Sequence, residues 1–207
     1  KSPYYINKAD FVACHNSSYI LKGYKIVNDV KPGGTFLLDC QWDDEALEKH
    51  LPADVKKYIA DNNIKFYTID ATTIAAKQSG NVKVKNTVLQ SAFFALANIL
   101  PKDEAIEYMK KMAYKSYIKK GEAMVQLNYN AIDAGANAMK EVAVPASWKT
   151  VAPDAPKAKA VGTRPELVDY VNEIVDPVSL MDGDKLPVSA FTKYVDGTLP
   201  QGAAAYE

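Results

Sequence analysis

Three short apolar runs between Ala9 and Asp70 constrain the fold more than any other feature of this chain. They are FVAC, TFLL and FYTI, at residues 11–14, 35–38 and 66–69. Each is rich in strand-favouring residues and is bounded by polar residues, which is typical of a buried strand. The segments between them have helical spacing, and this alternation is the pattern of parallel βαβ units. We therefore predict an α/β fold with three α/β/α layers, a mainly parallel sheet, a helix-rich second half and an extended C-terminal arm.

Polar residues follow each of the three predicted strands, at 14–16, 39–40 and 70. With right-handed crossovers the carboxyl ends of the strands share one edge, and open α/β sheets bind ligands at that edge. His15 is there as a candidate acid or base, or as a hydrogen-bonded structural group. Asp39 and Asp70 are placed to bind a ligand hydroxyl or a metal, or to cap the helices that follow them.

The rest of the chain favours helices. Their expected ranges are about 19–30, 43–50, 53–60, 72–80, 86–100, 101–120, 122–142 and 166–174. Residues 31–34 (KPGG) predict a turn into the second strand. Residues 4–6 are a candidate edge strand, residues 81–85 a loop or short strand, and residues 186–191 a strand.

Composition divides the chain into three parts. Residues 1–148 form the α/β domain, and residues 149–165 are a linker rich in Pro, Ala and Lys. Residues 166–207 carry repeated turn signals and are too polar and short to hold a core alone. We expect this last part to be a small connecting domain or an arm that packs on a partner surface.

Charge and cysteine content exclude several classes of function. The 25 basic residues balance 25 acidic ones, which argues against nucleic acid or an anionic membrane surface as a partner. No apolar run approaches the ~20 residues of a membrane span. We expect Cys14 and Cys40 to be free, mostly buried thiols of a cytoplasmic protein. Two distant histidines give no zinc pattern, and glycine-rich phosphate loops are absent, so no metal site is predicted.

Five lysines mark the helix predicted at 101–120: Lys110, Lys111, Lys115, Lys119 and Lys120. Such a row either attracts a polyphosphate or is a solvated helix surface. Met109 and Met112 beside it have the spacing of core residues. No Ser–His–Asp order or paired-carboxylate motif stands out, so we assign no catalytic residue.

Several segments resemble one enzyme family. They are ADFVACHN at 9–16, QSAFF at 90–94, GDKLPVSAF at 183–191 and the terminal DGTLPQGAAAYE at 196–207. In this order they are similar to the central part of the single-chain pyruvate:ferredoxin (flavodoxin) oxidoreductases. The resemblance covers essentially the whole chain: the gamma-like domain of that family, beginning partway through it, and the following EKR-type small domain.

The resemblance implies a parent enzyme that converts pyruvate and coenzyme A to acetyl-CoA and CO2, with electrons passing to ferredoxin or flavodoxin. It implies thiamine diphosphate, Mg²⁺ and [4Fe-4S] clusters in a homodimeric parent. This chain lacks the Gly-Asp-Gly thiamine motif and cluster cysteines, so we expect it to bind none of these cofactors and to be inactive alone. Its partners would be the other domains of the parent.

The family's gamma-like domain is associated with coenzyme A (CoA), which suggests residues that face this substrate. The candidates are His15, Asn16, Asn86 and Gln90. Asn86 and Gln90 are one helical turn apart, so their amides point the same way. These amides either bond a pantetheine amide or a phosphate, or cap backbone groups inside the domain. The alternative for the whole chain is a stand-alone, non-catalytic α/β binding or scaffolding protein.

Overall fold

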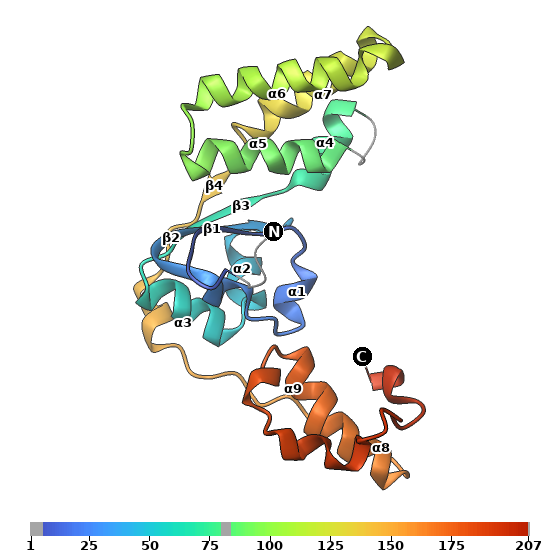
Figure 1. The fold of residues 1–207 in the computed structure, drawn as a ribbon. Coiled ribbons are helices and arrows are strands. Elements are labelled where there is room, and N and C mark those ends of the chain that lie inside the picture. Colours follow the sequence, from blue (N-terminus) through green and yellow to red (C-terminus); the bar gives the residue numbers. More distant parts are fainter. Residues whose placement is uncertain (1–5, 80–83, 207) are drawn as a thin grey trace.

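The computed structural model describes residues 6–79 and 84–206 of the 207-residue chain. A sheet lies between two layers of helices, and a separate helical unit follows at the C-terminus (Figure 1). The expectations for residues 4–6 and 81–85 fall mostly outside the described residues. Across residues 6–79 and 84–206, no helix is long and apolar enough to cross a membrane.

The sheet has the order β1-β2-β3-β4 in the described chain. Strands β1 (Ala9–Cys14), β2 (Val30–Asp39) and β3 (Lys65–Ile69) are parallel, and the two-residue β4 (Lys140–Glu141) pairs antiparallel to β3. The mainly parallel sheet is thus confirmed. The expected helix at 122–142 is too long, because β4 occupies its last part.

The predicted KPGG turn is a bulge inside β2. Ala9 pairs with Val30 and Phe11 with Thr35, so four residues of β2, 31–34, lie opposite the single residue Asp10 of β1. Gly33 has φ +74°, a backbone conformation that side chains disfavour. The bulge lets one continuous strand replace the separate turn and strand that the sequence predicts.

Strand β2 is the centre of two cores because its side chains alternate between the sheet faces. Phe36 and Leu38 face one hydrophobic cluster, and Leu37 faces the other. All three are at most 1% exposed. Full burial of each contributes about 1.5–3 kcal/mol. This two-sided burial explains why TFLL is a continuous apolar run and not an alternating one.

One face of the sheet is covered by α1 (Ser18–Leu21), the 3₁₀ helix Ile26–Asp29, α2 (Asp44–His50) and α3 (Ala53–Asp61). Asp43 caps α2, its side chain accepting from the Ala46 N–H at 2.8 Å. The helix expected at 19–30 is wrong as a single element. Gly23 interrupts it with φ +82°, and Leu180 of the C-terminal unit packs against that glycine.

The opposite face carries α4 (Ala71–Ser79), α5 (Lys85–Ala97) and α7 (Glu122–Gly135). Helix α6 (Lys102–Tyr117) lies farthest from the sheet, against α5 and α7 (Figure 1). The expected break at Gly121 is confirmed, since this residue separates α6 from α7 with φ +100°. The helix expected at 86–100 ends earlier, at Ala97, because Asn98 adopts a left-handed conformation.

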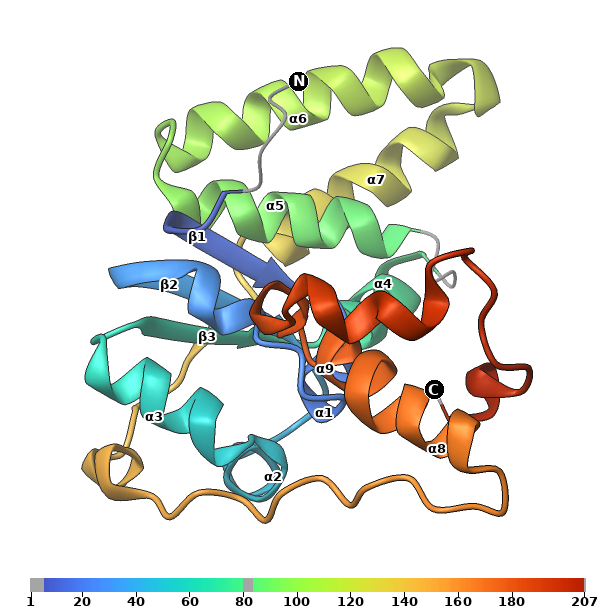
Figure 2. The same ribbon diagram turned by 60° about the horizontal axis from the view of Figure 1, so that its bottom comes forward.

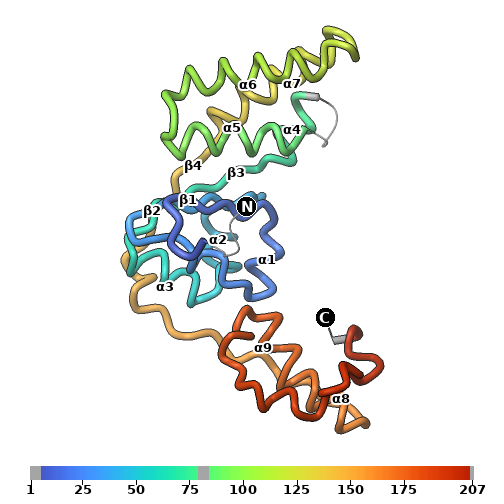
Figure 3. Tube along the Cα trace, viewed as in Figure 1, coloured from blue at the N-terminus to red at the C-terminus, as the bar shows by residue number. Residues whose placement is uncertain are grey.

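The C-terminal unit begins after an extended stretch, residues 151–164, which passes α2 and α3 in Figure 2 and can be followed as a tube in Figure 3. Asp154 fixes this stretch by accepting the Ala53 N–H at 2.6 Å. A continuous helix follows, made of α8 (Pro165–Tyr170), the π-helical turn Val171–Val175 and α9 (Asp176–Ser179). The strand expected at 186–191 is wrong, because Val188–Tyr194 is a 3₁₀ helix.

This unit buries apolar side chains of its own, contrary to the expectation that it has no core. The buried residues are Leu167, Tyr170, Val171 and Ile174. Tyr170 also meets Tyr194 edge to face, with ring centroids 4.9 Å apart. The unit touches the α/β domain through Leu180 at Gly23 and through the Lys25–Asp182 ion pair at 2.6 Å.

Candidate functional site

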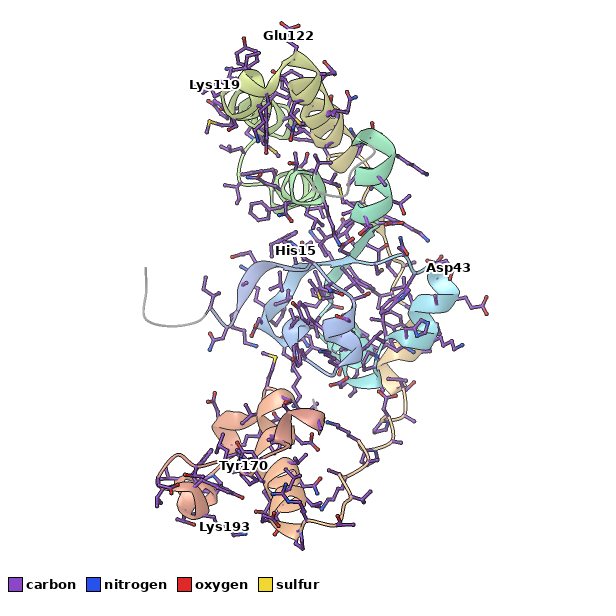
Figure 4. All side chains as sticks on the ribbon, turned by 90° about the vertical axis from the view of Figure 1, so that its right-hand side faces the viewer. His15, Asp43, Lys119, Glu122, Tyr170 and Lys193 are labelled. Atoms are coloured by element: carbon purple, nitrogen blue, oxygen red, sulfur yellow. The ribbon has the colours of Figure 1, made fainter. Side chains whose placement is uncertain are left out.

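A groove of about 550 Å³ lies between β1 and the start of α5. It is lined by Phe11, Ala13, His15, Asn86, Leu89, Gln90 and Phe93. Figure 4 shows His15 at the sheet, on the side that faces the α5 layer. One groove is therefore lined by three of the four candidate residues: His15, Asn86 and Gln90. In the sequence, 70 residues lie between His15 and Asn86.

Strand and helix periodicity place these side chains together. Phe11 and Ala13 alternate along β1, and His15 follows the strand at the next alternate position, so the three side chains line the same groove. Asn86 and Gln90 are one turn apart on α5 and share a face of the helix. Phe11 and Phe93 close the floor of the groove with an edge-to-face contact, their ring centroids 5.2 Å apart.

The two amides in the groove are available to a ligand. Asn86 and Gln90 are exposed, and neither side chain makes a hydrogen bond to any other described residue. In contrast, the buried Asn128 donates its amide N–H to the Met124 carbonyl at 2.9 Å. The groove thus combines apolar walls with two unused amides, a composition that suits an elongated ligand with alternating aliphatic and amide groups.

Asn16 lines a different depression. Its side-chain oxygen accepts the Ser18 N–H at 3.0 Å, and its carbonyl accepts from the Cys14 thiol at 3.2 Å. The depression has a volume of about 290 Å³ and is lined by Asn16, Ser17, Asp39, Cys40, Gln41, Trp42, Asp70, Thr72 and Lys85. Asn16 therefore lies with the strand-end residues Asp39 and Asp70, as expected, but it does not line the groove of the other three candidates.

The two strand-end acids act as caps here. Asp39 is 5% exposed, and its Oδ1 accepts the Ala71 N–H at 3.0 Å at the start of α4. Its Oδ2 forms an ion pair with Lys85 Nζ at 2.5 Å, but the direction of approach is not that of a hydrogen bond. Asp70 Oδ1 accepts the Thr73 N–H at 2.9 Å. Of the two readings open for these acids, the structure supports the cap.

Lys85 is a residue of this edge that sequence reasoning missed. It begins α5, directly before Asn86, and its ammonium neutralises the buried Asp39 carboxylate. No short-range pattern signals the pair, since the partners lie on a strand and a helix that are distant in sequence.

The two cysteines are free and buried, as expected. Burial raises the pKa of the Cys14 thiol, and burial raises the pKa of the Cys40 thiol to about 11. Both thiols are therefore protonated at neutral pH and are poor nucleophiles. Across residues 6–79 and 84–206, no group of three or more His, Cys, Asp or Glu side chains is placed to hold a metal ion.

The fold is thus an α/β architecture with a groove between β1 and α5. A match to the family described as pyruvate ferredoxin/flavodoxin oxidoreductase covers residues 1–138, and a match to the EKR domain, a domain of unknown function, covers residues 154–207. The chain belongs to the pyruvate ferredoxin/flavodoxin oxidoreductase family.

Relatives match the chain from end to end. A pyruvate-flavodoxin oxidoreductase of Klebsiella pneumoniae is 43% identical over 206 residues, and a pyruvate:ferredoxin oxidoreductase of Moorella thermoacetica is 41% identical over 207 residues. Each alignment covers 100% of this chain and 17% of the relative. The chain thus corresponds to a segment of longer oxidoreductases, which does not favour the stand-alone scaffolding alternative.

A solved structure supports the fold. The PORC subunit of pyruvate oxidoreductase from Thermotoga maritima matches with a TM-score of 0.51 at 21% identity. The match covers 65% of this chain and 66% of that subunit. The likeness confirms the α/β architecture.

Proposed function

We propose that this chain works as a segment of a pyruvate:ferredoxin (flavodoxin) oxidoreductase, which converts pyruvate and CoA to acetyl-CoA and CO2 and passes electrons to ferredoxin or flavodoxin. Within it, the segment helps to place CoA and packs against other domains, and it has no catalytic activity alone. The names of the relatives support the reaction, and their greater length supports a role as one part of an enzyme.

The groove between β1 and α5 is the observation that carries the CoA assignment. The pantetheine arm of CoA alternates aliphatic groups with two amides. Phe11, Leu89 and Phe93 offer apolar contact, while the Asn86 and Gln90 amides offer both donors and acceptors. His15 borders the same groove, and Asn16 lies at the neighbouring depression as a more distant candidate.

The described residues do not fit the redox and thiamine cofactors of such an enzyme. A [4Fe-4S] cluster takes four cysteine thiolates, and this chain has two cysteines, both buried. In the described part of the chain, no group of three or more His, Cys, Asp or Glu side chains is placed to hold the Mg²⁺ that accompanies thiamine diphosphate. We therefore derive no chemical step within this chain and assign these cofactors to other domains of the enzyme.

The same proposal includes the organisation of the chain. We propose residues 1–148 as the gamma-like domain, 149–165 as the linker and 166–207 as the small EKR-type connecting domain. Its partners are the other domains of the oxidoreductase, which we place in the cytoplasm as a homodimer. The extended stretch at 151–164 and the separate core of the C-terminal unit support this division.

Calorimetric titration with CoA tests the proposal, with desulfo-CoA as a second ligand that lacks the thiol. We expect saturable binding of both, because in this proposal the groove contacts the two amides of the pantetheine arm and not its terminal sulfur. Removing one amide, in Asn86→Ala or Gln90→Ala, should weaken binding about fivefold, which corresponds to the ~1 kcal/mol of one hydrogen bond.

Gln126→Ala is the matched control, since Gln126 is an exposed amide on α7 outside the groove. It should bind CoA like the original chain. No binding up to millimolar CoA, or equal binding by all three variants, would contradict the assignment of this groove to CoA.

A further inference from the structure

A second groove lies between α5, α6 and α7, and it shares one lining residue, Gln90, with the proposed CoA groove. Its volume is about 320 Å³. The lining residues are Thr87, Gln90, Phe94, Leu100, Ala105, Tyr108, Met109, Met112, Ala113, Ser116, Tyr117, Asn128 and Ile132. Most of these side chains are apolar, so the groove offers hydrophobic contact to an occupant.

Helix α6 presents large apolar side chains along one rim of this groove. Tyr108 is 50% exposed and Met112 is 60% exposed. They are four residues apart, and Lys115 follows at the next helical step, so all three share a stripe of the helix. Exposed Met and Tyr side chains are enriched at surfaces that bind other proteins.

The end of the stripe is basic. The segment from Tyr108 to Lys120 contains five lysines and no acidic residue. Lys110 pairs with Asp133 and Lys111 with Glu107, but Lys115, Lys119 and Lys120 have no ion pair with any described residue. Figure 4 shows Lys119 at the outer end of the helical layer, near Glu122. The surface therefore attracts negative charge beside an apolar groove.

We propose that this α5–α6 groove is a docking site for an amphipathic helix with acidic flanks, supplied by another segment of the oxidoreductase polypeptide. Apolar side chains of that helix fill the groove at Met112 and Tyr108, and its carboxylates meet the three unpaired lysines. The source of the helix rests on the proposed function, because the relatives extend far beyond the 17% of their length that this chain matches.

The apolar groove favours a helix over a polyphosphate, the ligand that the lysines alone suggest. A polyphosphate needs cations but gains nothing from Met112, Leu100 or Phe94. A docked helix uses both features, because hydrophobic anchors supply affinity and the charged rim supplies orientation.

Fluorescence anisotropy with a labelled synthetic peptide tests the site on the full 207-residue chain. The peptide carries leucines at i, i+3, i+4 and i+7 and glutamates on its other face, and a scrambled peptide of the same composition is its control. Met112→Glu should weaken binding at least tenfold, since it places a charge in the groove. Reversing all three unpaired lysines to Glu should weaken it similarly and remove most of its salt dependence.

Control variants outside the groove show whether a loss of peptide binding is specific to the groove or follows from any added negative charge. Leu21→Glu changes an exposed apolar residue of α1, and Lys22, Lys65 and Lys77 changed together to Glu reverse three exposed lysines. Both controls should bind the peptide within twofold of the original chain. Circular dichroism confirms that each variant is folded.

Each of the following outcomes overturns the proposal. The scrambled peptide binds as tightly as the designed one, or Met112→Glu does not weaken binding. Tripolyphosphate displaces the peptide equally well from the original chain and from the Met112→Glu variant, or the chain self-associates through this surface in sedimentation experiments. Binding of purified flavodoxin at the same lysines would likewise show that the occupant is an electron carrier and not a helix of the same enzyme. CoA titration is independent, since Met112 and the three lysines do not line the CoA groove.

Discussion

Gly135 sets how closely α5 and α7 approach, and Gly135→Ala should test that packing. A Cβ at this position would lie 2.4 Å from the Val88 carbonyl oxygen and 2.9 Å from the Val88 Cα. These are backbone atoms of α5, so they cannot move aside as a flexible side chain does. The helices would have to separate by about 0.6 Å merely to reach 3.0 Å, the shortest approach that Cβ atoms make.

The expected loss of stability follows from two opposing terms. Overpacking a well-packed interior costs about 1–3 kcal/mol, and a clash with helix backbone belongs at the upper end of that range. Replacing a helical Gly by Ala returns about 0.5–1 kcal/mol of backbone entropy. The net destabilisation should therefore be about 2 kcal/mol. The shift of α5 should also weaken CoA binding, because Asn86 and Gln90 lie on that helix.

Urea unfolding followed by tryptophan fluorescence measures this change. Trp42 and Trp148 are the two tryptophans of the chain, and both pack on the core of the α/β domain, so the signal reports that domain. Gly183→Ala is the control, because its Cβ would meet only Val178 at an ordinary 3.4 Å, and it should change stability by less than ~0.5 kcal/mol. A Gly135→Ala variant as stable as the original chain would refute the close helix contact.

Two further predictions concern titratable groups. Hydrogen bonds from Lys56 and from the Trp148 indole lower the pKa of Glu48 in the folded chain. The ionised Glu48 therefore stabilises the fold above pH 4.5, and this stabilisation is lost as the pH falls through the lower folded-state pKa. Trp148→Phe should reduce this loss of stability in acid in unfolding experiments, and an unchanged pH profile would contradict the role of the indole. Burial raises the pKa values of Cys14 and Cys40, so iodoacetamide at pH 8 should label both thiols slowly in the folded chain and quickly in urea. Rapid labelling of the folded chain would show instead that the two cysteines are accessible thiolates.

Local sequence was sufficient where one short segment decides the structure. The three apolar runs specified three parallel strands, Asp43 and Asp70 specified helix starts, and Gly121 specified a helix end. Each of these signals depends on side chains within a few residues, so the chain carries the information locally. The resemblance to one oxidoreductase family was also a property of the sequence alone, and the family comparison confirmed it.

Long-range contacts decided the remaining elements. The helix expected at 19–30 breaks at Gly23, where Leu180 from the far end of the chain packs, and the helix expected to reach residue 142 stops because β4 completes the sheet beside β3. A local pattern cannot encode these outcomes, since propensity is a weak preference that tertiary packing overrides.

The candidate site divides in the same way. The sequence identified His15, Asn86 and Gln90 as residue types suited to a ligand and placed His15 at a strand end. Only the tertiary structure decided that α5 lies across β1, which brings these three into one groove and leaves Asn16 in another. The physical reason is that a site made from separate elements depends on how those elements pack. One contact that positions α5, Val88 against Gly135 of α7, joins residues whose proximity no local pattern encodes.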